Sequence, residues 1–190
     1  MPQPAIKYLS PEEYLALEET AEFKSEYFQG EIFNMAGASV NHNQIITNLV
    51  IEIGTALKNK ECRIFSNDMR LWVESKNLFT YPDLVIVCNK LEYYPDRNDT
   101  ITNPQIIIEV LSESTENYDR GKKFLFYRSI PTFQEYILID QYSVHIEQFS
   151  IGDNRRWVLT EYNDLNDVLK FTKIDFQIQF TDIYSQVEFD

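Results

Sequence analysis

The chain has 190 residues, 44% of them hydrophobic and 25% charged, and a formal net charge of −13. This composition is typical of a globular protein and excludes a largely disordered chain, and the length suits one hydrophobic core. We therefore predict a single domain over residues 1–190. The acidic charge argues against a protein that coats nucleic acid, because such affinity comes mostly from phosphate neutralisation by Lys and Arg.

Targeting signals and cysteine motifs are missing from the sequence. No apolar run approaches the roughly 20 residues of a membrane helix, and the N-terminal residues lack the basic-then-apolar pattern of a signal peptide. We predict a cytoplasmic protein with no membrane partner. Cys62 and Cys88 have the spacing of neither a zinc cluster nor a disulfide framework, so we expect reduced thiols.

The first elements are a helix and a hairpin. Ser10, followed by a proline and two glutamates, predicts the start of a helix that runs to about residue 21. Residues 25–37 then predict a β-hairpin that turns at Gln29 and Gly30. Glu26 opens its first arm.

A second helix and a series of strands follow. Apolar residues recur every four positions from Ile45 to Leu57, which predicts a helix whose start Asn41 caps. Strands are predicted at residues 64–74, 81–88, 104–112, 135–140, 142–150 and 155–162. Residues 114–129 change to a helical period, so the strands on either side of this helix are predicted to be parallel neighbours. The last two strands are predicted to be antiparallel.

Two predicted core strands each carry one acid. Asp83 lies in YPDLVIVC and Glu109 in IIIEVL, runs that are otherwise apolar enough to be buried on both faces. An ionised carboxylate buried without a partner is costly, so each acid needs a cation, a base or a place at the open end of the sheet. Oxygen ligands of this kind suit Mg²⁺ or Mn²⁺ rather than zinc. The alternative is a plain internal ion pair for Glu109 and a turn cap for Asp83.

The predicted helix after Glu109 carries basic residues. Asp119, Lys123 and Tyr127 are four residues apart and share one face, from which Lys123 can reach back to the strand end. A surface ion pair between Asp119 and Lys123 is the simpler interpretation. The positive charges gathered in this acidic chain are those of Arg120, Lys122, Lys123 and Arg128.

These residues resemble the PD-(D/E)XK nuclease superfamily and, within it, the bacterial Uma family of restriction-endonuclease-like proteins. The resemblance covers roughly residues 10–150. It rests on Glu26, Gly30, Met35-Ala36, His42, Pro82-Asp83, Glu109 to Ser112, Ser114-Thr115, Asp119, Lys123, Tyr127 and the strand EYILID. It implies an α/β (α+β) fold with a restriction-endonuclease-like core: a central mixed sheet flanked by helices, an N-terminal hairpin and C-terminal antiparallel strands.

One position departs from the superfamily pattern. Two residues after Glu109 the superfamily has a lysine, and this chain has Leu111. The resemblance implies that the lysine has moved to the following helix, where Lys123 is the matching residue and Lys122 the second choice.

The resemblance also implies metal-dependent hydrolysis of phosphodiester bonds in DNA. Asp83 and Glu109, with Glu26, would hold Mg²⁺ or Mn²⁺, and Lys123 would orient the attacking water or stabilise charge on the phosphate. Additional site residues would be His42, Asp119, Lys122 and Tyr127; each also has an ordinary structural interpretation as a cap, ion pair, solvated charge or core residue.

Arg120, Lys122 and Arg128 are predicted to contact DNA phosphates, in a homodimer that concentrates this basic patch. Two alternatives remain open. The chain could be a catalytically inactive interaction or regulatory protein that keeps the fold, or a hydrolase of another phosphoester.

Overall fold

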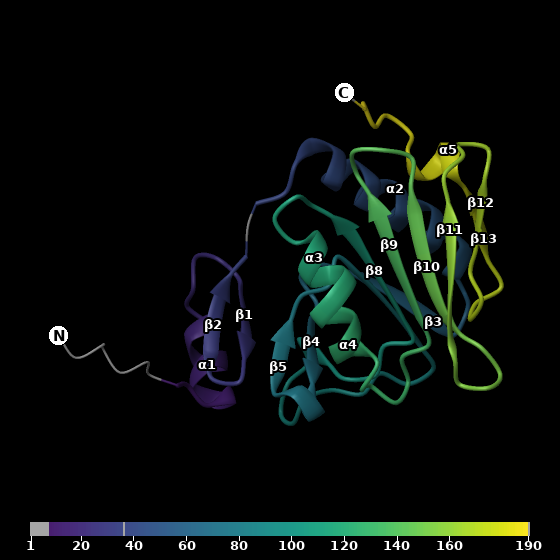
Figure 1. Ribbon diagram of the computed structural model, residues 1–190. Helices are drawn as coiled ribbons and strands as arrows, with labels where there is room; N and C mark the ends of the chain where they lie inside the picture. The colour runs from purple at the N-terminus through teal and green to yellow at the C-terminus, as the bar shows by residue number, and fades with distance from the viewer. Residues whose placement is uncertain (1–7, 36, 190) are drawn as a thin grey trace.

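The computed structural model describes residues 8–35 and 37–189, so the motif residue Ala36 lies outside the described residues. Two sheets dominate the fold (Figure 1). The six-stranded sheet has the order β11-β10-β9-β8-β6-β3 and the five-stranded sheet the order β2-β1-β5-β4-β7. The strands are β1 (Ser25–Phe28), β2 (Glu31–Asn34), β3 (Cys62–Ser66), β4 (Arg70–Val73), β5 (Leu78–Thr80), β6 (Leu84–Cys88), β7 (Thr100–Ile101), β8 (Ile106–Leu111), β9 (Glu135–Asp140), β10 (Ile146–Ile151) and β11 (Trp157–Tyr162), with β12 (Val168–Lys170) and β13 (Gln177–Gln179) as a separate pair.

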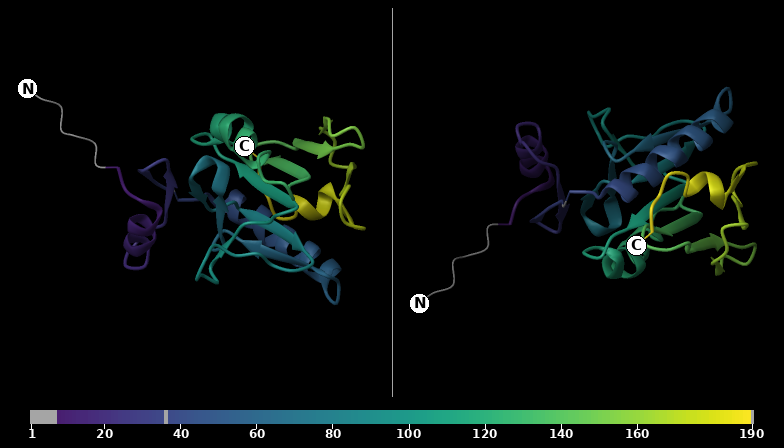
Figure 2. Two further views of the ribbon diagram at one scale, coloured as in Figure 1. Left: turned by 90° about the horizontal axis from the view of Figure 1, so that it is seen from below. Right: turned by 90° about the horizontal axis from the view of Figure 1, so that it is seen from above.

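Helices cover both faces of the six-stranded sheet. The long helix α2 lies against one face, and the segment from α3 to α4 lies against the other (Figures 1 and 2). The helices are α1 (Pro11–Glu18), α2 (Val40–Leu57), α3 (Glu116–Tyr118), α4 (Phe124–Tyr127) and α5 (Phe180–Ile183), with a 3₁₀ turn η1 (Glu74–Lys76) and a π turn η2 (Asp119–Lys123). This mixed α+β architecture is the predicted one.

The centre of the sheet follows the predicted strand–helix–strand unit. β8 and β9 are parallel, whereas β6 pairs with β8 in the antiparallel sense, so the sheet is mixed. Every residue of β8 is buried. Alternate residues of the strand enter two separate cores: Ile108 packs with α2 on one side, and Ile107 packs with Tyr127 on the other. The prediction of a strand buried on both faces is therefore confirmed.

The start of α2 differs from the prediction. Ser39 is the N-cap, and its hydroxyl oxygen accepts a hydrogen bond from the His42 N–H, whereas Asn41 lies inside the first turn. The Asn41 side-chain amide instead donates to the backbone carbonyls of Gln141 and Glu188. Both residue types cap helices well, and the sequence pattern alone placed the boundary two residues too late.

The N-terminal elements form a distinct layer at one end of the molecule (Figures 1 and 2). Ser10 and Glu13 make the reciprocal capping box that starts α1. The predicted hairpin forms as β1 and β2. Its turn residues Gln29 and Gly30 have φ angles of 50° and 99°, and a Cβ on Gly30 would lie 2.8 Å from the Tyr8 ring, so glycine is required there.

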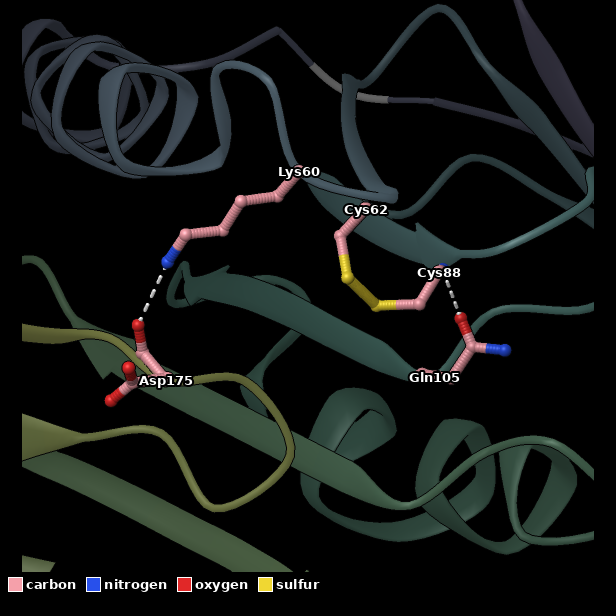
Figure 3. The surroundings of a disulfide bond; sticks show 5 residues. All are labelled: Lys60, Cys62, Cys88, Gln105 and Asp175. Atoms are coloured by element: carbon pink, nitrogen blue, oxygen red, sulfur yellow. Dashed lines mark hydrogen bonds between the residues drawn. A yellow bond between two sulfur atoms is a disulfide. The ribbon is translucent and has the colours of Figure 1, made fainter.

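The two cysteines are bonded, so the prediction of reduced thiols was wrong. Cys62 on edge strand β3 lies directly opposite Cys88 at the end of β6, and a disulfide joins them (Figure 3). The two residues are 26 positions apart in the sequence. Strand register brings them together, and register was not visible in the cysteine spacing. Over residues 8–35 and 37–189, no helix has the length and apolarity that crossing a membrane requires.

Candidate active site

A cleft of about 960 Å³ opens where the N-terminal hairpin, the start of α2 and the centre of the six-stranded sheet meet. Glu26 comes from the hairpin, His42 from α2, Asp83 from the position just before β6, and Glu109 from β8. Lys123 reaches the cleft from the π turn. Residues that the sequence singled out on five separate segments therefore line one cavity.

Asp83 and Glu109 are linked to each other through the backbone. The Asp83 N–H donates to Glu109 Oε2 at 3.2 Å, and the Val110 N–H donates to Asp83 Oδ2 at 2.8 Å. The antiparallel pairing of Leu84 with Ile108 sets this arrangement, because it places the two acids side by side on neighbouring strands. Each carboxylate thus keeps a fixed orientation at the floor of the cleft.

Lys123 lies among three carboxylates. Its Nζ is 3.1 Å from Glu109 Oε1, 3.1 Å from Asp119 Oδ1 and 3.7 Å from Glu26 Oε1. The side chain is 9% exposed. Burial lowers the pKa of Lys123, but the neighbouring Glu109, Tyr127, Glu26 and Asp119 together outweigh burial, so the net result is a pKa above the usual value for lysine. Lys123 is therefore protonated and carries a positive charge within the site.

The π turn shapes this part of the helix. Asp119 and Lys123 bound the turn, and Lys123 and Tyr127, which lie four residues apart and share one face, both contact Glu109 Oε1. Asp119 is within ion-pair distance of Lys123 but lacks hydrogen-bond geometry to it. Its backbone carbonyl accepts from the Tyr136 hydroxyl at 3.2 Å, which fixes the turn to β9. Single π turns inside α-helices occur frequently at functional sites.

Glu109 is shielded from water and surrounded by donors. Its Oε1 accepts from Lys123 Nζ and, at 2.9 Å, from the Tyr127 hydroxyl. Burial raises the pKa of Glu109, while the Lys123 charge opposes the shift and the Asp119 and Asp83 charges add to it. Burial also raises the pKa of Tyr127, so its phenol stays protonated and donates.

Glu26 is placed by the packing of the hairpin. Phe28, two residues along β1, stacks on Phe126 of α4 with ring centroids 5.0 Å apart. Glu26 lies on the same side of the strand, and the Thr80 hydroxyl on β5 donates to its carboxylate. The Glu26 side chain is 13% exposed, so it is held in the cleft wall rather than solvated. The sequence patterns did not single out Thr80.

His42 contacts the site from the first turn of α2. Its Nε2 is 3.2 Å from Asp83 Oδ2, and its Nδ1 is buried with no hydrogen-bond partner among the described residues. Gln141, which the sequence reasoning missed, supports this region: its Nε2 donates to the Leu111 carbonyl at 2.6 Å, and its Oε1 accepts from the Ser39 hydroxyl. Gln141 directly follows β9, and the carboxyl ends of adjacent parallel strands are where site residues gather. That signal was present in the sequence.

The predicted phosphate contacts are dispersed. Lys122 is exposed and lines the cleft, but Arg120 pairs with Glu116 and Glu147, each at 2.7 Å. Arg128 lies over the Phe124 ring, 4.9 Å from its centroid. Neither arginine lines the cleft, and their contact with DNA stays a prediction.

The donor set suits a hard cation. Over residues 8–35 and 37–189, no three His, Cys, Asp or Glu side chains are grouped closely enough to hold a metal ion by themselves. Asp83 and Glu109 are the two oxygen donors that the strand pairing brings together, and Lys123 contacts both Glu109 and Glu26. Mg²⁺ commonly takes one or two protein carboxylates and completes its shell with water and substrate phosphate. The pair of acids therefore fits Mg²⁺ or Mn²⁺.

A solved structure shares this fold. A solved structure described as "a putative nuclease belonging to DUF820", from Anabaena variabilis, superimposes with a TM-score of 0.76. The match covers 95% of this chain and 99% of that chain, at 18% sequence identity. This similarity shows the fold class, a mixed α+β protein with central sheets flanked by helices.

Sequence comparison gives the family. Residues 11–180 match the model of the Uma2 family, described as "Putative restriction endonuclease", and the chain belongs to that family. Two proteins of Synechocystis sp. are similar: "Uncharacterized protein sll1609" is 40% identical over 166 residues, covering 87% of this chain and 94% of that protein. "Uncharacterized protein slr1290" is 35% identical over 190 residues, covering 99% and 97%. The predicted family resemblance is confirmed.

Proposed function

We propose that this protein is a Mg²⁺- or Mn²⁺-dependent endonuclease that hydrolyses phosphodiester bonds in DNA. The observation that carries the proposal is the convergence of Asp83, Glu109 and Lys123 in one cleft, with the two acids linked through their backbones and Lys123 Nζ 3.1 Å from Glu109. The nuclease fold and the family membership support it.

The roles follow from the contacts. Asp83 and Glu109 would hold the metal ion, which polarises the scissile phosphate and lowers the pKa of a bound water. Lys123, charged at neutral pH, would donate to a phosphate oxygen or orient the attacking water. Tyr127 and Asp119 would position Lys123 and Glu109, and His42 would hold the orientation of Asp83.

Cleavage assays with purified protein test the proposal. We expect Mg²⁺- or Mn²⁺-dependent cleavage of DNA, lowered roughly 10²–10³-fold in Lys123→Met, the loss typical when one donor to a developing negative charge is removed. Asp83→Asn, which preserves side-chain size, should be comparably impaired. Lys90→Ala removes an exposed lysine that does not line the cleft and serves as the matched control. Equal cleavage by wild type and Lys123→Met would refute the assignment.

A second candidate function, an interaction or regulatory role without catalysis, rests on the contacts of Lys123. Because Lys123 contacts three carboxylates, it offsets part of their negative charge without a metal, as expected of a nuclease fold kept for interaction or regulation. Calorimetric titration with Mn²⁺ separates the two: the endonuclease binds the ion, and Asp83→Asn weakens that binding. The predicted homodimer stays a prediction, which analytical ultracentrifugation would test.

A further inference from the structure

The mouth of the cleft exposes large apolar and aromatic side chains. Phe33 and Met35 from the end of the hairpin are 47% and 36% exposed, and Tyr142 from the turn after β9 is 56% exposed. All three line the same cavity as Asp83 and Lys123. Large apolar side chains that are exposed together commonly mark a binding site, and these three lie beside the candidate catalytic groups.

Phe33 is tied by strand register to the catalytic cluster. It lies directly opposite Glu26 in the pairing of β1 with β2, so the two side chains share one face of the hairpin. Glu26 in turn lies 3.7 Å from Lys123 Nζ. A flat group stacked on the Phe33 ring would therefore lie beside the cluster that we propose cleaves phosphodiesters.

Tyr142 is fixed in place before any ligand arrives. Its hydroxyl oxygen accepts a hydrogen bond from the Glu113 N–H at 3.3 Å, and its own N–H donates to Asp140 Oδ1 at 2.8 Å. The hydroxyl end is thus held while much of the ring remains open to solvent. A side chain that is oriented in advance loses little conformational entropy on binding.

Positive charge is scarce at this cleft. Among the described residues that line it, Lys122 is the one exposed Lys or Arg, since Lys123 is buried among acids. Duplex DNA is held mainly by neutralised phosphates, so one exposed cation in a chain of net charge −13 supports little duplex affinity. Unpaired bases offer another source of affinity, because stacking on an aromatic ring contributes roughly 1–3 kcal/mol per base without regard to sequence.

We propose that the cleft takes unpaired nucleotides, so that the preferred substrate is single-stranded DNA, with bases stacked on Phe33 and Tyr142. This proposal rests on the proposed function and specifies its substrate class. A cavity of about 960 Å³ lies at the upper end of the range of small-ligand sites, roughly 300–1,000 Å³, and suits a short length of single strand. Met35 adds apolar surface beside Phe33.

The test is binding measured without cleavage. Fluorescence anisotropy in EDTA compares a labelled single strand with a duplex of the same sequence. We expect the single strand to bind at least about tenfold more tightly, and Phe33→Ala and Tyr142→Ala each to lose roughly 5–150-fold, the equivalent of one stacked base. Tyr142→Phe keeps the ring and should retain most of the affinity. Val158→Ala removes a similarly exposed apolar side chain on β11, outside the cleft, and is the matched control.

The outcomes separate this proposal from the nuclease assignment. Duplex binding as tight as single-strand binding, absence of binding to either DNA, or unchanged affinity in both alanine variants would overturn it. So would an effect of Phe33→Ala that appears only as a change of oligomeric state in light scattering. Cleavage with Mn²⁺ is scored separately: equal cleavage of duplex overturns the single-strand preference alone, and no cleavage of any DNA overturns the nuclease while the binding result still decides this proposal.

Discussion

Two buried glutamates on neighbouring parallel strands have opposite surroundings. Glu109 on β8 is 3% exposed and contacts an ammonium ion and a phenol, whereas Glu135 on β9 is 0% exposed and is surrounded by neutral donors. Glu135 accepts from the Gln148 side chain and from the Thr172 N–H, which tie the β12 region to the sheet. Glu109 lies toward the carboxyl end of its strand and Glu135 begins its strand.

The difference shows that burial of a carboxylate does not by itself indicate chemistry. Burial raises the pKa of both groups. What distinguishes Glu109 is a charged partner, Lys123, and a place at the end of the strand where a cleft admits a ligand. Glu135 is a structural acceptor that satisfies backbone and side-chain donors in the interior.

Cleavage by two matched variants gives the sharpest comparison. Glu109→Gln should lower metal-dependent DNA cleavage roughly 10²–10³-fold, because it removes a proposed metal ligand and the charge that Lys123 faces. Glu135→Gln makes the same chemical change and should cleave at the wild-type rate. Initial rates on one substrate measure both, and an equal loss in the two variants would abolish the distinction.

The disulfide provides a stability change outside the cleft. Replacing Cys62 and Cys88 together by serine should lower the free energy of unfolding by about 3–4 kcal/mol, the chain-entropy value for a bridge across 26 residues. Cleavage should persist below the new unfolding midpoint, because Cys88 ends β6 whereas Asp83 lies just before the start of that strand. Urea unfolding measures the loss. A reductant should destabilise the wild type to the same extent and leave the double variant unchanged.

Glu135→Gln should affect stability although it spares cleavage. Its amide offers one acceptor oxygen in place of two to the donors of Gln148 and Thr172, so we expect a loss of about 1–3 kcal/mol in the free energy of unfolding. Urea denaturation measures it, with Glu52→Gln on the exposed face of α2 as the control. A variant as stable as the control would show that the carboxylate is not the structural acceptor described above.

The smallest expected effect is a pH dependence of the free energy of unfolding, caused by the Glu135 carboxyl group. Because burial raises the pKa of this carboxyl in the folded state, the folded chain holds its proton at pH values where the unfolded chain has lost it. The contribution to stability is full below the unfolded pKa near 4.5 and is lost as pH rises through the folded value. As pH rises, the free energy of unfolding of the wild type should therefore fall relative to that of Glu135→Gln. A difference that is constant with pH would contradict the raised pKa.

Much of the site could be predicted because its charged residues stand out within the strand and helix patterns of the sequence. Asp83 and Glu109 stand out as charges in apolar runs, and Lys123 lies one helix beyond them; the structure brings the three together. The alternative of a plain ion pair for Glu109 described a real contact with Lys123 but did not include Asp83 or the cleft.

What could not be predicted depends on contacts distant in sequence. Glu135 finds its partners 13 and 37 residues later, at Gln148 and Thr172, in loops and strands whose positions no local pattern fixes. The Cys62–Cys88 bond depends on the register of β3 against β6. Thr80 is an ordinary polar residue until its strand is placed beside the strand that carries Glu26.

The π turn at residues 119–123 has a consequence for helical phase. An α-helix advances about 100° per residue, so a π turn contains, in effect, one extra residue that shifts everything after it around the axis. Deleting Gly121 would restore the ordinary period before Lys123 and rotate Lys123 and Tyr127 together away from the azimuth at which both reach Glu109. The extra residue therefore sets the angular position of this lysine and tyrosine relative to the start of the helix, which makes the length of this helix as important to the site as its composition.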